Sequence, residues 1–373
     1  MKNVSFQSQQ THPNPPPQDP DQEDRSSTSA TKFEWDFSVS AVVSSSVAGG
    51  NISDTLGVVE VNSSGNLFAT GGIARKIRVY SLNSLLSSSS VEATLFDHAT
   101  ACHYCICTPA KLSSLKWKPG SGSQVMGSAD YDGVVTEYDL ETKMPVYERD
   151  EHSGRRVWSM DYSHWDPVVG ASGADDGTMQ MWDPRHDGGK CVAKVVLGSP
   201  VCCVEFSPFG GALVAVGCAD RKAYVYDVRK IVDPVAVFDG HQRTVSYTRF
   251  LDDHTVVTSG TDGCLKMWDI EKQHMIRTYK GHTNQRRFVG LSIWRNQGLI
   301  GCGSESNQLF VYDKRWGEPI WVHGFEPEGG SRYEDGFVSS LCWSQESEDE
   351  CTLVGGGSDG VVKIFSGKRK PLT

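Results

Sequence analysis

The sequence predicts an all-β fold built from repeats, because short β-type runs end again and again in an aromatic residue followed by Asp or Ser. Most of these endings lie about 44 residues apart, which is the period of a four-stranded propeller blade. A single blade cannot bury both of its faces, so it must stack on its neighbours. The sequence therefore predicts a seven-bladed WD40 β-propeller. The seven endings are Tyr80-Ser81, Tyr138-Asp139, Trp182-Asp183, Tyr226-Asp227, Trp268-Asp269, Tyr312-Asp313 and Phe365-Ser366.

The best-formed repeat supplies the register for the other blades. It starts at Gly240-His241, has strands at 244–250 and 255–259, turns at 261–263 and closes with 265–268. In such a blade a His, a hydroxyl, the Asp of the turn and the closing Trp can form one buried chain of hydrogen bonds. Other blades depart from this pattern, and Glu305 stands where an Asp is expected. The expected structural sets are His152, Ser172, Asp176 and Trp182 in one blade, and His241, Thr258 or Ser259, Asp262 and Trp268 in another.

Two apparent catalytic motifs are better explained by the repeat. The Ser, His and Asp residues that resemble a nucleophilic triad recur at the blade period, which favours a structural role. The Gly-rich run 355–360 matches both a dinucleotide loop and a nucleophile elbow, but 361–365 is a predicted strand, whereas both motifs require a helix there. We therefore expect no enzyme activity, no catalytic residue and no cofactor.

The chain divides into an arm, a propeller and a short tail. Residues 1–31 are rich in Pro, Gln and Ser and poor in large apolar groups, so we expect a disordered arm. The propeller is expected over 32–367, with 368–373 as a tail. Residues 32–38 are expected to form the outer strand of the last blade, so that both ends of the chain share one sheet and close the ring.

The composition indicates which kinds of partner and which cellular compartment are expected. The net charge of −10 argues against a general nucleic-acid binder. No apolar run is long enough to span a bilayer, and the 11 cysteines fit a reducing compartment, so we expect a soluble intracellular protein. The Cys-rich run 102–107 lacks the second paired half of a structural zinc site, and no metal is expected.

The loops that enter the first strand of several blades are basic. Propeller topology places these loops on one face, around the central channel. Arginine can pair with carboxylates and large rings can hold an apolar anchor, so the combination describes a peptide-binding face; a solubilising rim over core aromatics is the alternative. The residues concerned are Arg155 and Arg156 with Trp158, Arg243, and Arg286 and Arg287 with Phe288, while Arg78 lies on the last strand of the first blade.

A second Arg pattern follows the closing strands. In Trp182-Asp183-Pro184-Arg185 an Arg stands just beyond the strand, and the pattern recurs at Arg229 and Arg315. These arginines fall on the opposite rim, where they either dock a large scaffold or simply solvate the strand ends.

Several segments go beyond the general blade pattern and resemble a known family. The chain after residue 32 is similar to the propeller of the plant constitutive-photomorphogenesis ubiquitin ligase and its suppressor-of-phytochrome partners. The segments that carry the resemblance are 75–80, 128–133, 151–159, 201–204, 244–247 and 281–290.

The resemblance implies a Val-Pro peptide site on the narrow propeller face. Transferred by motif, its residues are Arg78, Tyr104, Arg156, Trp158, Arg243 and Phe288. The ligase has Lys where this chain has Arg78 and Arg243, which keeps the charge and changes the geometry. The resemblance also implies that Trp182, Asp183 and Arg185 dock a cullin-4 adaptor, as in a ubiquitin-ligase substrate receptor.

The N-terminal arm indicates which members of this family the chain resembles most. It has no paired metal-binding cysteines, heptads or kinase signature, so the chain resembles the plant repressors of UV-B photomorphogenesis. That resemblance implies binding to the Val-Pro tail of the UV-B photoreceptor, competition with the E3 ligase, return of the photoreceptor to its dimer, and a place in the nucleus and cytosol.

Overall fold

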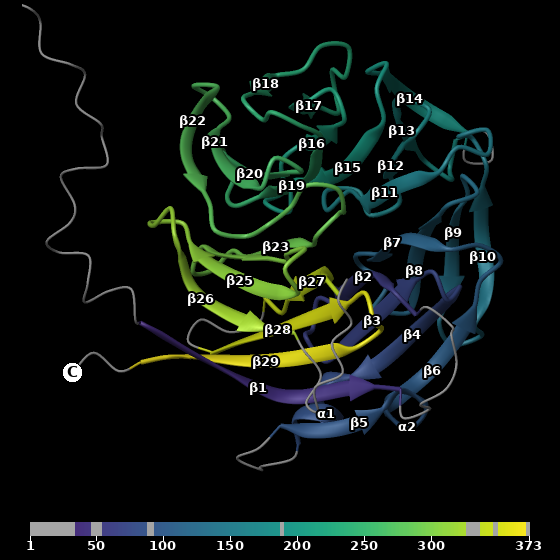
Figure 1. Ribbon diagram of the computed structural model, residues 1–373. Coiled ribbons are helices and arrows are strands. Elements are labelled where there is room, and N and C mark those ends of the chain that lie inside the picture. Colours follow the sequence, from purple (N-terminus) through teal and green to yellow (C-terminus); the bar gives the residue numbers. More distant parts are fainter. Residues whose placement is uncertain are drawn as a thin grey trace, which may run out of the picture.

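Seven β-sheets form a closed ring around a central channel (Figure 1). The structure, a computed structural model, describes residues 34–45, 54–87, 93–186, 190–325, 336–345 and 350–370. The predicted all-β propeller is confirmed, while the expected arm at 1–31 lies outside the described residues. No helix in the described part of the chain is long and apolar enough to cross a membrane.

Six blades have four strands and blade 7 has five, and the strands are named here in order outward from the channel. Blades 1 to 3 contain β2 (Leu56–Val61), β3 (Leu67–Gly72), β4 (Lys76–Ser81) and β6 (Cys102–Cys107); β7 (Leu112–Trp117), β8 (Val125–Asp130), β9 (Val135–Asp139) and β10 (Met144–Arg149); and β11 (Val157–Tyr162), β12 (Gly170–Ala174), β13 (Thr178–Trp182) and β14 (Cys191–Val196). Blades 4 and 5 contain β15 (Val201–Phe206), β16 (Leu213–Cys218), β17 (Lys222–Asp227) and β18 (Ala236–Asp239); and β19 (Val245–Phe250), β20 (Thr255–Gly260), β21 (Cys264–Asp269) and β22 (His274–Tyr279).

The last two blades complete the ring. Blade 6 contains β23 (Leu291–Trp294), β24 (Leu299–Cys302), β25 (Gln308–Asp313) and β26 (Pro319–Gly324), and blade 7 contains β27 (Val338–Trp343), β28 (Glu350–Gly357), β29 (Val362–Arg369) and β1 (Trp35–Ser44). We call the face that carries the loops into the first strands the narrow face, and the face that carries the turns after the third strands the wide face.

The strand β1 closes the ring. It runs antiparallel to β29, from Trp35 opposite Arg369 to Val43 opposite Val362. The closing strand therefore covers 35–44 rather than the expected 32–38, and β29 takes in the first residues of the expected tail. Trp35 packs edge-on against Trp294 of blade 6, with ring centroids 5.1 Å apart, so aromatic burial reinforces the backbone pairing.

An insertion in blade 1 strengthens the same junction. Between β4 and β6 the chain forms α1 (Leu82–Leu86), β5 (Thr94–Asp97) and α2 (His98–Ala101). The strand β5 pairs parallel with β1 and becomes the fifth strand of blade 7 (Figure 1). The buried His98 contacts the Tyr80 hydroxyl at 2.7 Å and the Gly360 carbonyl at 2.9 Å, so it links blades 1 and 7.

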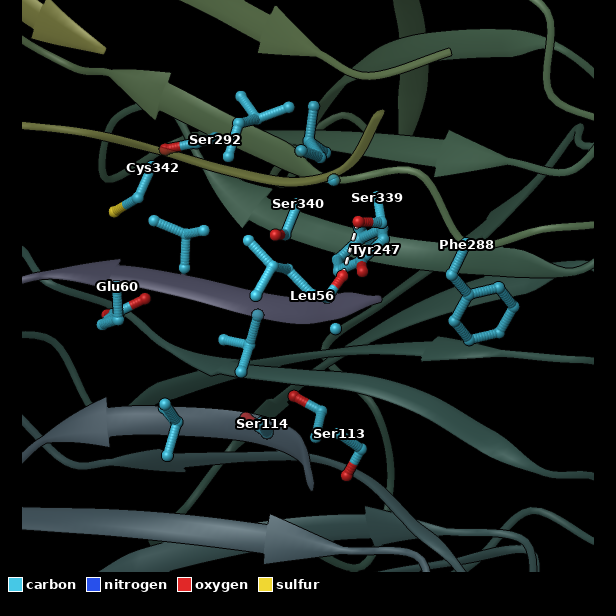
Figure 2. Close-up of a pocket in the computed structure, with 18 of the residues that line it drawn as sticks. Leu56, Glu60, Ser113, Ser114, Tyr247, Phe288, Ser292, Ser339, Ser340 and Cys342 are labelled. Atoms are coloured by element: carbon cyan, nitrogen blue, oxygen red, sulfur yellow. Dashed lines mark hydrogen bonds between the residues drawn. The ribbon is translucent and has the colours of Figure 1, made fainter. Parts of the chain in front are cut away.

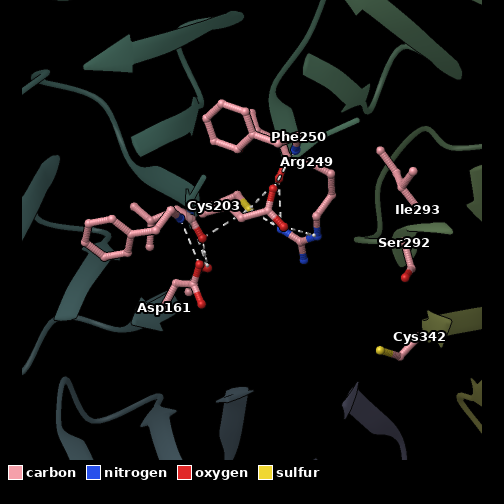
Figure 3. A network of polar contacts seen from close by, with 12 residues as sticks. Asp161, Cys203, Arg249, Phe250, Ser292, Ile293 and Cys342 are labelled. Atoms are coloured by element: carbon pink, nitrogen blue, oxygen red, sulfur yellow. Dashed lines mark hydrogen bonds and ion pairs between the residues drawn. The ribbon is translucent and has the colours of Figure 1, made fainter. Parts of the chain in front are cut away.

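Side chains of the inner strands bond to the backbone of the neighbouring blade. The Asp161 carboxylate accepts the Phe206 N–H at 2.8 Å, and Glu205 accepts the Phe250 N–H at 2.6 Å. Arg249 and Arg295 lie beside Glu205, with nitrogen–oxygen distances of 3.7 and 3.1 Å, so Glu205 is paired with two arginines. Figure 3 shows Asp161, Cys203 and Arg249 in this network. The bonds of Asp161 and Glu205 to the backbone join neighbouring inner strands, and the pair of Arg295 with Glu205 connects blade 6 to blade 4, so these contacts hold the blades in register.

The hydrogen-bond sets expected in blades 3 and 5 both form, but only in blade 5 does the tryptophan take part. In blade 5, His241 contacts Asp262 at 3.0 Å and Thr258 at 2.7 Å, and the Trp268 indole N–H donates to Thr258 at 2.8 Å. In blade 3, His152 contacts Asp176 at 2.9 Å and Ser172 at 2.8 Å. The Trp182 indole nitrogen, however, has no acceptor among the described residues, and Arg149 lies over its ring at 4.9 Å.

Removal of the closing strand tests the ring. We expect deletion of residues 1–37 to destabilise the domain by more than about 5 kcal/mol, because two buried aromatic residues and three of the eight residue pairs between β1 and β29 are lost. Deletion of 1–29 leaves β1 intact and should not unfold the domain. Thermal denaturation followed by circular dichroism measures both, and equal melting temperatures of the two truncations would contradict this account of closure.

A matched pair of tryptophan substitutions tests the hydrogen-bond sets. Trp268→Phe should cost about 1 kcal/mol more than Trp182→Phe, because only the Trp268 indole donates a hydrogen bond. Both rings are buried, so their packing losses are comparable. Urea unfolding of the two variants gives the difference, and equal free energies of unfolding would show that the bond to Thr258 contributes nothing.

Candidate functional site

Trp158 is an exception to the repeat. The inner strands of six blades share a register shift after their first residue. Such a bulge re-aims the side chain of the extra residue. That residue is small in five of the six blades, so the packing of the propeller does not require an aromatic side chain at this position. The six residues are Gly57, Ser113, Trp158, Cys202, Ser246 and Ser339.

Aromatic rings from four blades meet at the narrow mouth of the channel. The ring centroid of Trp158 lies 4.6 Å from that of Phe288 and 6.3 Å from that of Tyr131, and Tyr247 lies 6.2 Å from Phe288. We call these four residues the aromatic cluster. They line a cavity of about 420 Å³ that continues into the channel, as Figure 2 shows for Tyr247 and Phe288. The cavity is large enough for one or two apolar side chains.

Arg156 is held between two of these rings. Its guanidinium carbon lies 4.2 Å from the Tyr131 ring centroid and 4.6 Å from that of Trp158. Its Nε is buried without a hydrogen-bond partner among the described residues. The Trp158 indole donates to Asp175 at 2.6 Å, which fixes the ring beneath the guanidinium. Stacking on rings leaves the in-plane donors of arginine available to a carboxylate or carbonyl.

Glu305 shapes the loop that carries Phe288. Its carboxylate accepts the backbone N–H groups of Gln285, Arg286 and Arg287 at 3.0, 2.7 and 2.7 Å. Partial burial opposes ionisation, but these three donors outweigh it and lower the Glu305 pKa. The residue that departs from the Asp pattern therefore anchors the basic loop of blade 6.

Arg243 and Arg287 border the aromatic cluster. Arg243 donates to the Gln285 carbonyl at 3.1 Å, which ties the loops entering blades 5 and 6 together. The Arg287 guanidinium lies 4.3 Å from the Phe337 ring centroid, and Arg287 and Phe337 line the cavity, whereas Arg243 does not. The rim of the mouth is therefore cationic and partly held in place before any ligand binds.

The structure does not bring Arg78 and Tyr104 to the cluster. Arg78 pairs with both carboxylate oxygens of Asp54, at 3.1 and 2.8 Å, and neither Arg78 nor Tyr104 lines the cavity. Tyr104 lies on the outer strand β6 opposite Val79, where Lys143 of blade 2 sits over its ring at 5.6 Å. The motif transfer placed both residues too near the mouth, because Arg78 serves the loop into β2 and Tyr104 packs between blades.

Tyr131 takes the place in the cluster that was expected of Tyr104. It lies in the turn after β8, and its N–H donates to the Lys111 carbonyl at 2.9 Å. Turns between second and third strands lie on the narrow face, as do the loops into first strands. Tyr131 belongs to the segment 128–133, but it lies in a turn between second and third strands and not in a loop that enters a first strand.

The second Arg pattern gives a local ion pair in three blades. Arg185 donates from Nε to Asp183 at 2.8 Å and from Nη2 at 2.7 Å, and this pairing lowers the Asp183 pKa to about 2. Arg229 with Asp227 and Arg315 with Asp313 form the same arrangement. Trp182 itself is buried and does not reach this rim.

In the part of the chain that the structure describes, no three His, Cys, Asp or Glu side chains are grouped so that they could hold a metal. The three cysteines of the run 102–107 lie along the outer strand β6 and form no disulfide with any residue that the structure describes.

Comparison with known proteins agrees with this architecture. Residues 143–183 match the model of the WD domain, G-beta repeat, and residues 164–313 match that of the nucleolar protein 10-like N-terminal domain. The class is thus that of WD-repeat β-propellers.

The relatives define the family within that class. The chain is 61% identical to the WD repeat-containing protein RUP2 of Arabidopsis thaliana, over 86% of this chain and 89% of the relative. It is 57% identical to RUP1 of the same plant, over 91% and 86%. The chain belongs to this RUP family of WD-repeat proteins. The Arabidopsis E3 ubiquitin-protein ligase COP1 is 33% identical over 82% of this chain, which spans 44% of the ligase.

The pH dependence of stability tests the role of Glu305. Because its folded pKa is lowered, the ionised carboxylate stabilises the protein above its unfolded pKa, and this contribution is lost as the pH falls through the folded pKa. Carboxyl groups titrate at about pH 3 to 5. In this range the melting temperature of the wild-type protein should therefore fall more steeply than that of Glu305→Gln. Parallel melting curves of the two proteins over this range would show that the loop does not depend on the charge.

Proposed function

We propose that this protein is a non-enzymatic peptide-binding regulator whose ligand sits on the aromatic cluster. The observation that carries the proposal is Arg156, a guanidinium stacked between Tyr131 and Trp158 with no ion pair among the described residues. A buried or half-buried charge of this kind is costly unless a partner supplies an acceptor. A ligand carboxylate or carbonyl over the cluster would supply it.

The chemistry of the mouth favours a peptide with a small apolar anchor and nearby acceptors. The cavity beside Trp158 and Phe288 accommodates a Val side chain, whose burial contributes about 1.5–3 kcal/mol. Proline packs well on aromatic rings, and its restricted backbone lowers the entropic cost of binding. The cationic rim of Arg243, Arg286 and Arg287 favours acidic flanks. These features support the Val-Pro ligand that the family resemblance implies.

The proposed ligand is the Val-Pro-containing tail of the UV-B photoreceptor. The chain and COP1 share a related propeller, so both would bind the same tail, and capture by this protein would exclude the E3 ligase. We propose that the protein in this way acts as a negative regulator of UV-B signalling, in the nucleus and cytosol, and promotes return of the photoreceptor monomer to its dimer.

Docking of a cullin-4 adaptor at Trp182, Asp183 and Arg185 stays a prediction of the resemblance. The local geometry of Arg185 recurs at Arg229 and Arg315, so it does not single out one blade as the docking point.

Replacement of Trp158 tests the proposed function. Trp158→Ala should weaken binding of a synthetic photoreceptor-tail peptide by about 2 kcal/mol or more, roughly 30-fold in Kd, because the anchor surface and the stacking support of Arg156 are both lost. Isothermal titration calorimetry on the folded variant measures the change. Trp165→Ala, on the wide face, is the matched control and should bind as wild type; unchanged affinity of Trp158→Ala would remove this site assignment.

A further inference from the structure

A second cavity lies on the wide face between blades 3 and 4. It has a volume of about 770 Å³ and is separate from the channel mouth. Its floor and walls are mainly apolar, and we call it the wide-face groove. The apolar residues that line it are Trp165, Val169, Met181, Val192, Phe206 and Val228.

The groove presents a tryptophan from an ordered loop. The side chain of Trp165 is 77% exposed, although its neighbours are held in place. The Asp166 N–H donates to the Ser163 hydroxyl at 3.1 Å, the Val169 N–H donates to the Asp166 carbonyl at 2.9 Å, and Arg185 pairs with the Asp166 carboxylate. A large ring on a fixed loop beside an apolar groove is a typical feature of a docking surface.

The most exposed charged side chains at the groove are cationic, and Asp166, which is 36% exposed and paired with Arg185, also lines it. The Arg185 and Arg229 side chains are 54% and 78% exposed, whereas their partners Asp183 and Asp227 are 9% and 20% exposed and lie beneath them. His186 and Lys190 add two further nitrogen-bearing side chains to the lining. A segment that covers the groove therefore meets positive charge first, and should combine apolar groups with carboxylates.

The N-terminal segment of this chain has that combination. Pro13, Pro15, Pro16 and Pro17 are followed at once by the acidic block Asp19-Pro20-Asp21-Gln22-Glu23-Asp24. Proline-rich segments dock on exposed Trp and Tyr rings at a small entropic cost. The order along the chain, prolines and then acids, matches an apolar groove with a cationic rim.

The first described residue lies on the same face as the groove. Glu34 pairs with Arg315 at 3.1 Å, just after β25, and the turns after third strands define the wide face. Residues 13–20 are 14–21 positions before Glu34, which corresponds to about 46–70 Å of extended chain. Two four-stranded blades and a channel between them measure about 40–45 Å across. The segment is thus long enough to reach blades 3 and 4 from blade 7.

We propose that residues 13–21 dock in the wide-face groove of the same chain, with prolines against Trp165 and the carboxylates of Asp19 and Asp21 against Lys190, Arg185 and Arg229. Asp21 is 13 positions before Glu34, so about 43 Å of extended chain separates them. The bound segment would cover Arg185, so that any partner using this rim must displace it. This proposal is independent of peptide binding at the aromatic cluster.

Zero-length carbodiimide cross-linking of the full chain tests the proposal, because the reagent joins carboxylates to lysine amines that are already in contact. We expect a link between Asp19 or Asp21 and Lys190 in the monomer. The exposed pair Lys222 and Asp239, 3.2 Å apart, provides an internal reference for its yield. Trp165→Ala, and separately Pro15→Ser with Pro16→Ser and Pro17→Ser, should each lower the relative yield at least about threefold, since the apolar contact is lost.

Leu95→Ala is the matched control, because Leu95 is also an exposed apolar residue but lies on β5 of blade 7. It should leave the yield unchanged. Three results would overturn the proposal: no link to Lys190 while the reference pair reacts, links only to Lys76 or Lys111 at the narrow face, or links only in a cross-linked dimer. An undiminished yield in Trp165→Ala would overturn the role given to the groove.

Discussion

The pairing of β1 with β29 is the interaction on which the rest of the molecule depends. A propeller blade is stable only between two neighbours, so a ring of seven has no stable partial form with exposed blade faces. The chain meets this requirement by giving blade 7 its outer strand from the other end of the sequence. The buried Trp35 and Phe37, the added strand β5 and the link from His98 to Gly360 all reinforce that one junction.

Closure also determines where recognition is possible. Inside the ring, polar side chains are committed to the next blade, as Asp161 and Glu205 are. Outside this framework the loops are free to vary. Two exceptions to the repeat lie at the narrow mouth: Trp158, where five other blades have small residues, and Arg156, which has no ion pair with any residue that the structure describes. Glu305 shows how a departure from the repeat is used, because its longer side chain reaches three backbone donors and so fixes the loop that carries Phe288.

The sequence predicted the fold better than the site. Periodic residues report the blade directly, so the aromatic endings located the third strands, and the complete set around His241 and Trp268 was foreseen. The site depends on which loops converge in space. Arg156, Trp158 and Phe288 were identified because they interrupt the period on loops of known position, whereas Tyr131 was missed because it sits in a second kind of turn. Tyr104 was misplaced because its strand, β6, directly follows the insertion of blade 1, which disturbs motif matching there. The sequence could not show that the Trp182 indole N–H lacks an acceptor among the described residues, because hydrogen bonding depends on side-chain orientation and not on residue type alone.

The most direct test of the central claim is fluorine NMR of the protein labelled with 5-fluorotryptophan. The chain has 10 tryptophans, and single Trp→Phe variants assign the two signals of interest, Trp158 and Trp165. On titration with the Val-Pro photoreceptor-tail peptide, the account predicts a saturable shift of the Trp158 signal while the Trp165 signal stays in place. Saturable binding with an unmoved Trp158 signal would contradict it.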